Sequence, residues 1–478
     1  MNETDTLTLD PAGRDPRDSH KDGLTAAPAS FAQQRLWILA QMDRAVDAYV
    51  IVQAMRLQGA VDPEGVRAAV HGVARRHAAL RTRFADVDGG LRQIVEPDPP
   101  LPFATHDLRA DPDPDAACQT LIAEETARPF NLTRAPLWRV QLCRLGELDW
   151  ALVLVIHHIV ADGWSLELLR QELALLYQAH VTGAPAHLPR FTGSYADHAA
   201  WERGSEGQAA FETARAYWHG VFAEPPARPD LPSDGTRMML APGATVRVEI
   251  DALRTEAFGD LAAAHGASLF MGLSALVRVL VYRYTQEGDL TLGTPVAGRD
   301  RPELETQVGL FVNLLALRAP VDPDAGFADA VRVEAETVQA ALAHQHYPFD
   351  RLIDELGASR DPARGPLFDV LVALQNVRQS DTALAGLRIG EMPVGSTAAK
   401  YDLTFEFAEH ADGLVLNLTY STSMFRAETV QRIAGHLERL LEAVFADPDR
   451  PIGELALLGR PERAQLDAWA GHAPAYPR

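Results

Sequence analysis

The stretch LVLVIHHIVADGWS, residues 152–165, holds the pattern that decides the fold and points to the site. Its apolar run predicts a buried strand, which leads directly into His157 and His158. Because side chains alternate along a strand, the two rings should point to opposite faces, and only one of them can face a given channel. Ser165 is a suitable N-cap for the helix that we expect to follow.

The histidine pair is open to three interpretations. An imidazole titrates near neutrality and can accept a proton from a nucleophile, which favours a catalytic role. The simplest alternative is that both rings are structural residues at the end of a core strand. A metal site with Asp162 as a third ligand is disfavoured, because adjacent rings diverge and the sequence contains no second cluster such as HExxH.

The two residues that follow this segment could support the site. The Asp162 carboxylate could accept a backbone hydrogen bond or pair with an arginine, which would fix the turn that holds the ring. Gly163 has no Cβ, so another backbone or a substrate could approach it closely.

The sequence lacks the motifs of several other enzyme classes. It contains no GxSxG, no P-loop, no GxGxxG and no catalytic-cysteine context. Its cysteines, Cys118 and Cys143, have neither metal-binding spacing nor a disulfide framework, and we expect passive roles for both. Direct transfer between two bound substrates therefore fits better than covalent catalysis.

Composition places the chain among ordinary globular proteins of a reducing cytoplasm. Its 478 residues favour two domains or lobes, and 47% hydrophobic residues suffice for large cores. The net charge of −21 disfavours nucleic acid and anionic lipid as partners. The apolar runs are shorter than the ~20 residues of a membrane helix. Residues 1–26 are polar, carry no signal peptide, and are predicted to be a disordered leader, with a short docking segment as the alternative.

Strand and helix patterns alternate through both halves of the chain. Strands are expected at 48–59, 138–145, 151–156, 245–250, 289–296, 368–376 and 413–421. Helices are expected at 30–42, 63–84, 165–180, 268–285, 327–344 and 427–447. We therefore predict an α/β protein of two sandwich lobes, 27–188 and 189–460, with a Pro- and Gly-rich connection at 181–194 and a linker-like tail at 461–478.

HHIVADG, residues 157–163, matches the HHxxxDG signature of condensation domains of nonribosomal peptide synthetases. HxxxD alone is shared with a wider set of acyltransferases, so the flanking motifs decide the resemblance. The other segments resemble further family motifs in the family's order: SFAQQRLWIL (30–39), RRHAALRTRF (75–84), YADHAAW (195–201), VGLFVNLLALR (308–318), HQHYPFDRL (344–352), RDPARGPLFDV (360–370) and YDLTF (401–405). The resemblance covers roughly residues 30–478.

The sequence departs from the family pattern at three positions. His198 stands where the family usually has an aromatic residue, Leu314 where Thr is frequent, and His346 where an acid is common. None of them touches the HHxxxDG segment, so we expect effects on pocket shape and subtype more than on activity.

The resemblance implies two chloramphenicol-acetyltransferase-like lobes in a V-shaped pseudo-dimer with a tunnel between them. The HHxxxDG residues would be the catalytic set: His158, His157, Asp162 and Gly163. His158 would sit in mid-tunnel, and Asp162 would pair with Arg299 or, alternatively, with Arg301. Further residues expected around the site are the supporting Trp164 and Ser165 and the tunnel candidates Asn313, Tyr347 and Gln375.

The implied reaction is attack of an acceptor amine on a donor thioester to form an amide. Donor and acceptor carrier proteins would insert 4'-phosphopantetheine arms at opposite ends of the tunnel, and the chain itself would bind no cofactor or metal. A downstream adenylation domain is a further candidate partner, and we expect a monomer. His158 could be a base, a positioning group or an oxyanion stabiliser.

Several subtypes and rivals are weighed against this interpretation. Heterocyclisation domains carry aspartates in place of the histidines, and epimerisation domains have an aromatic residue after the serine, which DGWSLELL lacks. Dual epimerisation/condensation domains need a His-rich motif, and residues 27–50 contain no histidine. A domain joining an L-donor to an L-acceptor fits best. The alternatives are a free-standing enzyme with a small amine or alcohol acceptor, a non-catalytic docking platform, and a plant-type acyltransferase, whose DFGWG motif is missing.

Overall fold

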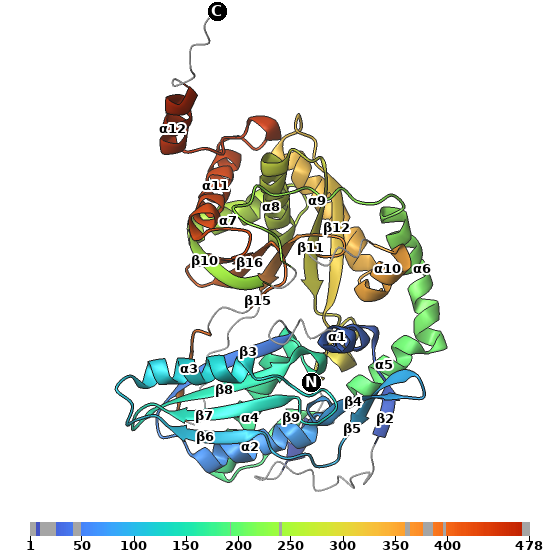
Figure 1. Ribbon diagram of the computed structural model, residues 1–478, viewed down its shortest axis with the longest axis vertical. Helices are drawn as coiled ribbons and strands as arrows, with labels where there is room; N and C mark the ends of the chain where they lie inside the picture. Colours follow the sequence, from blue (N-terminus) through green and yellow to red (C-terminus); the bar gives the residue numbers. More distant parts are fainter. Residues whose placement is uncertain are drawn as a thin grey trace, which may run out of the picture.

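The computed structural model describes residues 6–9, 25–41, 49–191, 193–238, 241–358, 364–375, 386–394 and 398–470. The chain forms two lobes of mixed helix and sheet, as predicted, with the N-terminal lobe at the bottom of Figure 1 and the C-terminal lobe at the top.

The N-terminal lobe is built on a five-stranded sheet in the order β14-β3-β8-β7-β6. Its bounds are β3 (Val50–Gln58), β6 (Phe103–Asp107), β7 (Trp138–Arg144), β8 (Asp149–His157) and β14 (Arg388–Glu391). Three helices cover the sheet: α2 (Pro63–Arg76), α3 (Pro114–Ala127) and α4 (Gly163–Thr182).

The central strand β8 is apolar throughout because both of its faces are covered. Leu152, Leu154 and Ile156 pack into the core that contains the buried faces of α2 and α4. Val153 and Val155 point the other way and pack against residues of α3. A strand buried on both faces shows a continuous apolar run, whereas a half-buried strand alternates.

Smaller elements complete this lobe. They are a three-stranded sheet of β2 (Thr25–Pro28), β5 (Gly90–Val95) and β4 (Thr82–Val87), the helix α1 (Phe31–Gln41), and the two-stranded pair of β1 (Thr6–Leu9) and β9 (Ala186–Pro189). Part of the predicted disordered leader is therefore strand. Residues 1–5 and 10–24 of it lie outside the described residues.

The helix predicted over 63–84 is wrong beyond residue 76. It ends at Arg76, and the chain passes through the 3₁₀ turn η2 (Ala78–Arg81) into β4. Asp88 and Gly89 then turn the chain into β5 with positive φ angles. The apolar residues at 80 and 84 thus belong to a turn and a strand, which a helical periodicity cannot distinguish over so short a stretch.

The C-terminal lobe is built on a seven-stranded sheet in the order β12-β11-β13-β16-β17-β10-β15. Its bounds are β10 (Ala241–Asp251), β11 (Asp289–Val296), β12 (Asn313–Pro320), β13 (Val370–Gln375), β15 (Ala398–Ala399), β16 (Leu403–His410) and β17 (Gly413–Ser421). The helices that pack on it are α7 (Ala252–Ala264), α8 (Leu269–Thr285), α9 (Phe327–Ala343), α10 (Phe349–Leu356) and α11 (Ala427–Ala446). The strands expected at 289–296 and 413–421 are confirmed in full.

Two helices connect the lobes. In Figure 1, α5 (Tyr195–Arg203) lies beside the lower lobe, and α6 (Ser205–Val221) rises along the right-hand side to the upper one. Ser194 starts α5 in a capping box with Asp197, which follows the connection expected at 181–194.

The lobes also exchange segments, so the predicted boundary at residue 189 does not divide the two cores. Strand β14 comes from the C-terminal half but pairs with β3 of the lower lobe. Residues 297–312 leave β11 and cross to the lower lobe, where Leu304 and Leu310 join its core.

Beyond the second core, the predicted tail begins as a helix, α12 (Arg460–Ala470), which has no buried residue. Residues 471–478 lie outside the described part of the chain. Within that part no single helix is long and apolar enough to cross a membrane; the pair α7 and α8, bent by 95°, reaches the required length and composition only together.

Candidate active site

The end of β8 holds the two histidines in different surroundings. The strand ends at His157, and His158 opens the 3₁₀ turn η3 (His158–Val160), its backbone N–H donating to the carbonyl of Tyr49 at 2.7 Å. The His157 ring is buried, meets the Phe130 ring edge-on, and accepts a hydrogen bond at Nδ1 from Ile159 N–H. Burial lowers the pKa of His157 to about 3. For His157 the simple structural interpretation fits.

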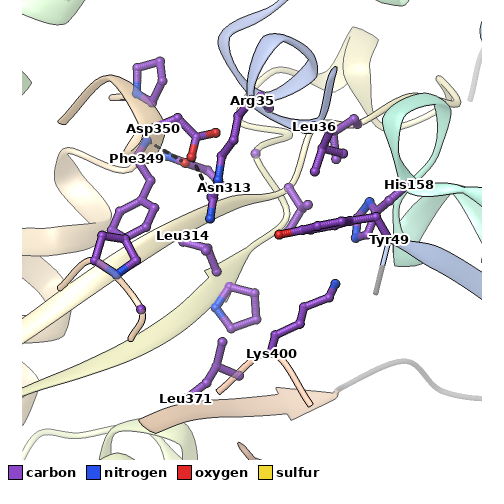
Figure 2. A pocket seen from close by; sticks show the side chains of 18 of the residues that line it. Arg35, Leu36, Tyr49, His158, Asn313, Leu314, Phe349, Asp350, Leu371 and Lys400 are labelled. Carbon is purple, nitrogen blue, oxygen red and sulfur yellow. Dashed lines mark hydrogen bonds and ion pairs between the residues drawn. The ribbon is translucent and has the colours of Figure 1, made fainter. Parts of the chain in front are cut away.

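His158 instead lines a cavity of about 680 Å³ between the lobes (Figure 2). Its Nδ1 is buried, which leaves Nε2 as the nitrogen that a substrate can reach. Burial, followed by the Lys400 ammonium, lowers the pKa of His158 to about 4, against an opposing contribution from the Asp162 carboxylate. The ring is therefore neutral at pH 7 and able to accept a proton or hydrogen bond.

The Asp162 carboxylate is fully engaged in holding the backbone. It caps α4 by accepting from Ser165 N–H at 2.8 Å, and it also accepts from the backbone N–H groups of Phe311 and Val312. Two nitrogens of Arg299 lie 2.8 and 3.0 Å from its oxygens. The predicted Asp162–Arg299 pair is confirmed.

The alternative partner Arg301 lies instead beside Asp300 and Glu303, with its guanidinium over the Trp201 ring. The prediction that Ser165 is the N-cap of the helix is wrong. Asp162 is the N-cap of α4, and Ser165 lies inside the helix. Its hydroxyl is within hydrogen-bond distance of Asp162 Oδ1 and of the carbonyl and N–H of Gly309, because the crossing segment packs against the start of α4.

Gly163 and Trp164 lie at the exposed start of α4. Among the described residues, no atom lies within 4 Å of a Cβ placed on Gly163. The expectation that another backbone approaches Gly163 closely is therefore wrong. Trp164 is 44% exposed, donates its Nε1–H to the Glu305 carbonyl at 2.9 Å, and covers Arg299. Trp164 thus contacts the segment of residues 297–312 that crosses between the lobes.

One of the three tunnel candidates lines the cavity. The amide of Asn313 donates to the carbonyls of Gln345 and Tyr347 and accepts from Phe349 N–H, so it fixes the entry to α10. Tyr347 is wrong as a wall residue: its side chain is buried in the upper core and its hydroxyl reaches Glu355. Gln375 is also wrong, because it is exposed at the end of β13.

The three departures from the family pattern, His198, Leu314 and His346, all line the cavity. Burial lowers the pKa of His198 to about 4, with Arg301 and Arg299 contributing in the same direction. A neutral imidazole therefore lies at this position. The expectation that these residues shape the pocket agrees with where they lie.

Sequence reasoning missed several cavity residues that come from both lobes. Arg35 of α1 pairs across the lobes with Asp350 of α10 at 2.6 Å, and Tyr49 lies between them and His158. Lys400 follows β15 and reaches into the cavity (Figure 2). One signal could have drawn attention to Lys400: apart from Lys21, it is the sequence's only lysine.

The site places the neutral His158 ring in a cavity bounded by both lobes. Among the described residues no group of three or more His, Cys, Asp or Glu side chains could hold a metal ion. His157 is packed away from the cavity and Asp162 is held by Arg299, so the three side chains of the suggested metal site diverge. The arrangement suits transfer of a group between two ligands that meet beside His158.

Comparison with known proteins gives consistent results. A family model described as "Condensation domain" matches residues 24–467. A linear gramicidin synthase of Brevibacillus parabrevis is 36% identical over 457 residues, which are 94% of this chain and 6% of that protein. This chain therefore spans a small fraction of that relative's length.

Two solved structures are similar over most of the chain. The X-domain from teicoplanin biosynthesis has a TM-score of 0.82 and 27% identity, covering 90% of this chain and 97% of that one. The first condensation domain of the calcium-dependent antibiotic synthetase, in complex with a substrate analogue, has a TM-score of 0.77 and 25% identity, covering 91% and 99%.

Proposed function

Because the chain belongs to the condensation domain family of nonribosomal peptide synthetases, we propose that it forms an amide bond between two carrier-bound substrates. An acceptor amine attacks the carbonyl carbon of a donor thioester, the amide forms, and the donor carrier's thiol leaves. The observation that carries this proposal is the neutral His158 ring, accessible in the cavity between the lobes. The cavity volume of about 680 Å³ is that of a substrate site.

Positioning is the main contribution that we assign to the site. A free α-amine has a pKa of about 7.7–8.0, so part of it is already neutral near pH 7. With a pKa of about 4, His158 is too weak a base to remove a proton from a neutral amine. It can accept a hydrogen bond from the attacking N–H and take the more acidic proton formed after attack. Alignment of two tethered substrates supplies up to ~7–11 kcal/mol.

The partners in this proposal are a donor and an acceptor carrier protein, each with a 4'-phosphopantetheine arm. The intact HHxxxDG and the DGWS sequence support a domain that takes an L-configured donor and an L-configured acceptor. The size of the relative above supports a place within a longer synthetase, with an adenylation domain as a further partner.

A second candidate function is docking of a tailoring enzyme. One structure similar to this chain, with a TM-score of 0.81, is a complex of the X-domain and OxyB from teicoplanin biosynthesis. Against this candidate stand the accessible His158 and the complete Asp162–Arg299 support, which a docking surface does not require.

A condensation assay tests the proposal. A donor acyl group on a carrier protein is offered an aminoacyl carrier, a free amine and a free alcohol, and products are read by mass spectrometry. His158→Ala should fold and lose at least 10²-fold in rate, whereas the control His410→Ala, at an exposed position on β16, should keep its activity. Absence of product with every acceptor, together with tight carrier binding, would favour the docking function.

A further inference from the structure

The cavity contains a lysine, Lys400, that has no role in the reaction as proposed above. Lys400 follows β15 in the upper lobe, and its side chain extends toward Tyr49 and His158 of the lower lobe (Figure 2). Its Nζ lies 4.8 Å from the centre of the Tyr49 ring. Across the described ranges of the chain, no carboxylate pairs with this ammonium and no side chain or carbonyl accepts a hydrogen bond from it.

The other cations of the cavity are neutralised. Arg35 pairs with Asp350 at 2.6 Å, and Arg364 lies 3.6 Å from Asp369. Among the described residues, the contact recorded for the Lys400 ammonium is with the face of Tyr49, which gives a weak attraction. The Lys400 side chain is exposed to the cavity, so a ligand oxygen that enters the cavity can take the place of water beside its ammonium.

Three acids of the cavity have partners other than Lys400. Asp402 accepts from Arg237, and Asp369 from Arg228. Glu202 accepts from Phe31 N–H. Burial lowers the pKa of Lys400 to about 8, with Arg35 contributing, so the group is mostly protonated at pH 7.

We propose that Lys400 binds the carbonyl oxygen of the donor thioester and stabilises the oxyanion that forms there. This assignment rests on the amide-forming function proposed above. The lone pair of the acceptor nitrogen attacks the carbonyl carbon, and the carbonyl π pair moves to the oxygen that faces the ammonium. When the C–O double bond re-forms, the C–S bond breaks and the thiolate leaves, while the proton lost from nitrogen passes to that sulfur through His158.

The positions of His158 and Lys400 favour separate roles for the two side chains. His158 comes from the lower lobe and accepts from the amine, whereas Lys400 comes from the upper lobe and donates to the oxygen. The attacked carbon would lie between them. A donor fixed where negative charge develops stabilises the transition state more than the ground state. Since the two groups belong to different lobes, separation of the lobes would disable the reaction.

Kinetics of two substitutions test the role. Lys400→Met removes the charge at similar length and should lower kcat by about 10²–10³-fold with a smaller change in KM. Lys400→Arg keeps the charge and should restore activity to within about 10-fold of the wild type, as expected if the positive charge is what acts. Lys21→Met, the sequence's other lysine, is the control and should match the wild type. A Lys400→Met variant within threefold of wild-type kcat would overturn the proposal.

The pH profile gives a readout that a purely structural role would not change. The wild-type rate should fall on the alkaline side as Lys400 loses its proton near pH 8, and this limb should move to higher pH in Lys400→Arg. The titratable groups that share the cavity with Lys400 are Arg35, Tyr49, His158, Tyr195, His198, Glu202, Asp300, His346, Asp350, Arg364, Asp369, Tyr401, Asp402 and Glu406. Tyr49, whose pKa burial raises, does not account for a limb near pH 8.

A binding measurement separates this proposal from the proposed reaction. Lysine labelled with ¹³C at Cε should give two signals, of which Lys400→Arg removes one. A pantetheine phosphonate, an anionic tetrahedral mimic, should raise the pKa of Lys400, whereas a neutral thioether of equal length should not. No shift with the phosphonate overturns the assignment of Lys400 whether or not the protein condenses substrates. A shift without any condensation product would support the anion site and overturn the amide-forming function.

Discussion

Asp162 and Arg299 stand 137 positions apart in the sequence, yet the carboxylate and the guanidinium lie 2.8 Å apart with side chains 2% and 1% exposed. The carboxylate caps α4, and Arg299 lies on the segment that crosses from the upper lobe. The aspartate of HHxxxDG therefore has a structural role. It holds residues 297–312 beside the turn that carries His158.

Breaking this pair should be costly. Asp162→Asn or Arg299→Leu should each lower the free energy of unfolding by about 3–5 kcal/mol, because each leaves a buried partner uncompensated. The double variant should lose less than the sum, since neither charge then remains. Arg67→Leu, which breaks an exposed pair with Glu64, serves as control and should change stability by less than about 1 kcal/mol. Denaturant titration measures all four, and strict additivity of the two buried substitutions would contradict the pairing argument.

Replacing His157 should mainly lower stability, whereas replacing His158 should mainly lower activity. His157→Ala removes a buried ring that accepts from Ile159 N–H, so the free energy of unfolding should fall by about 2–4 kcal/mol. His158→Ala opens the cavity wall and should cost less stability while removing most activity. Thermal unfolding and the condensation assay of both variants check this contrast. Equal losses of stability would contradict the different placement of the two rings.

The pH dependence of the reaction should follow the acceptor amine. His158 has a pKa of about 4 and is already neutral above pH 5, so its titration cannot shape the rate between pH 6 and 8. The rate should rise there as the amine loses its proton, and an acceptor of lower pKa should shift the rise to lower pH. Rate profiles with two acceptors of different pKa test this expectation. A rise that stays at the same pH for both acceptors would assign the titration to the enzyme.

Stability should fall as the pH is lowered below about 6.5. The pKa of His157 is lowered to about 3 and those of His158 and His198 to about 4, so the unfolded chain binds protons between pH 6.5 and 4 that the folded chain does not. Burial raises the pKa of Glu202 to about 7, and this group acts in the opposite direction because the folded state binds its proton first.

Glu202→Gln removes that opposing contribution. The variant should therefore lose stability more steeply than the wild type between pH 7 and 5, which urea titrations at both pH values would measure. An identical slope in the two proteins would show that the carboxyl of Glu202 does not titrate in this range.

Local sequence patterns were sufficient for much of the fold. The run that forms β8 is apolar because both faces are covered, and the bounds of β11 and β17 follow from strand composition and alternation alone. Local sequence patterns failed to predict several of the short strands. Strands β4, β5 and β6 were not recognised, because five or six residues at partial burial carry little periodicity.

The sequence by itself determined the class of the protein, the two-lobed α/β architecture, and the histidine that lines the cavity, because each depends on residues adjacent in the chain. Only the tertiary structure decided that Arg299 and not Arg301 pairs with Asp162, that Asn313 but neither Tyr347 nor Gln375 lines the cavity, and that Lys400 extends toward His158. Alternation along a strand fixes which face a side chain occupies. It cannot specify which distant segment covers that face, and here residues 297–312 cross from the upper lobe to form part of the site.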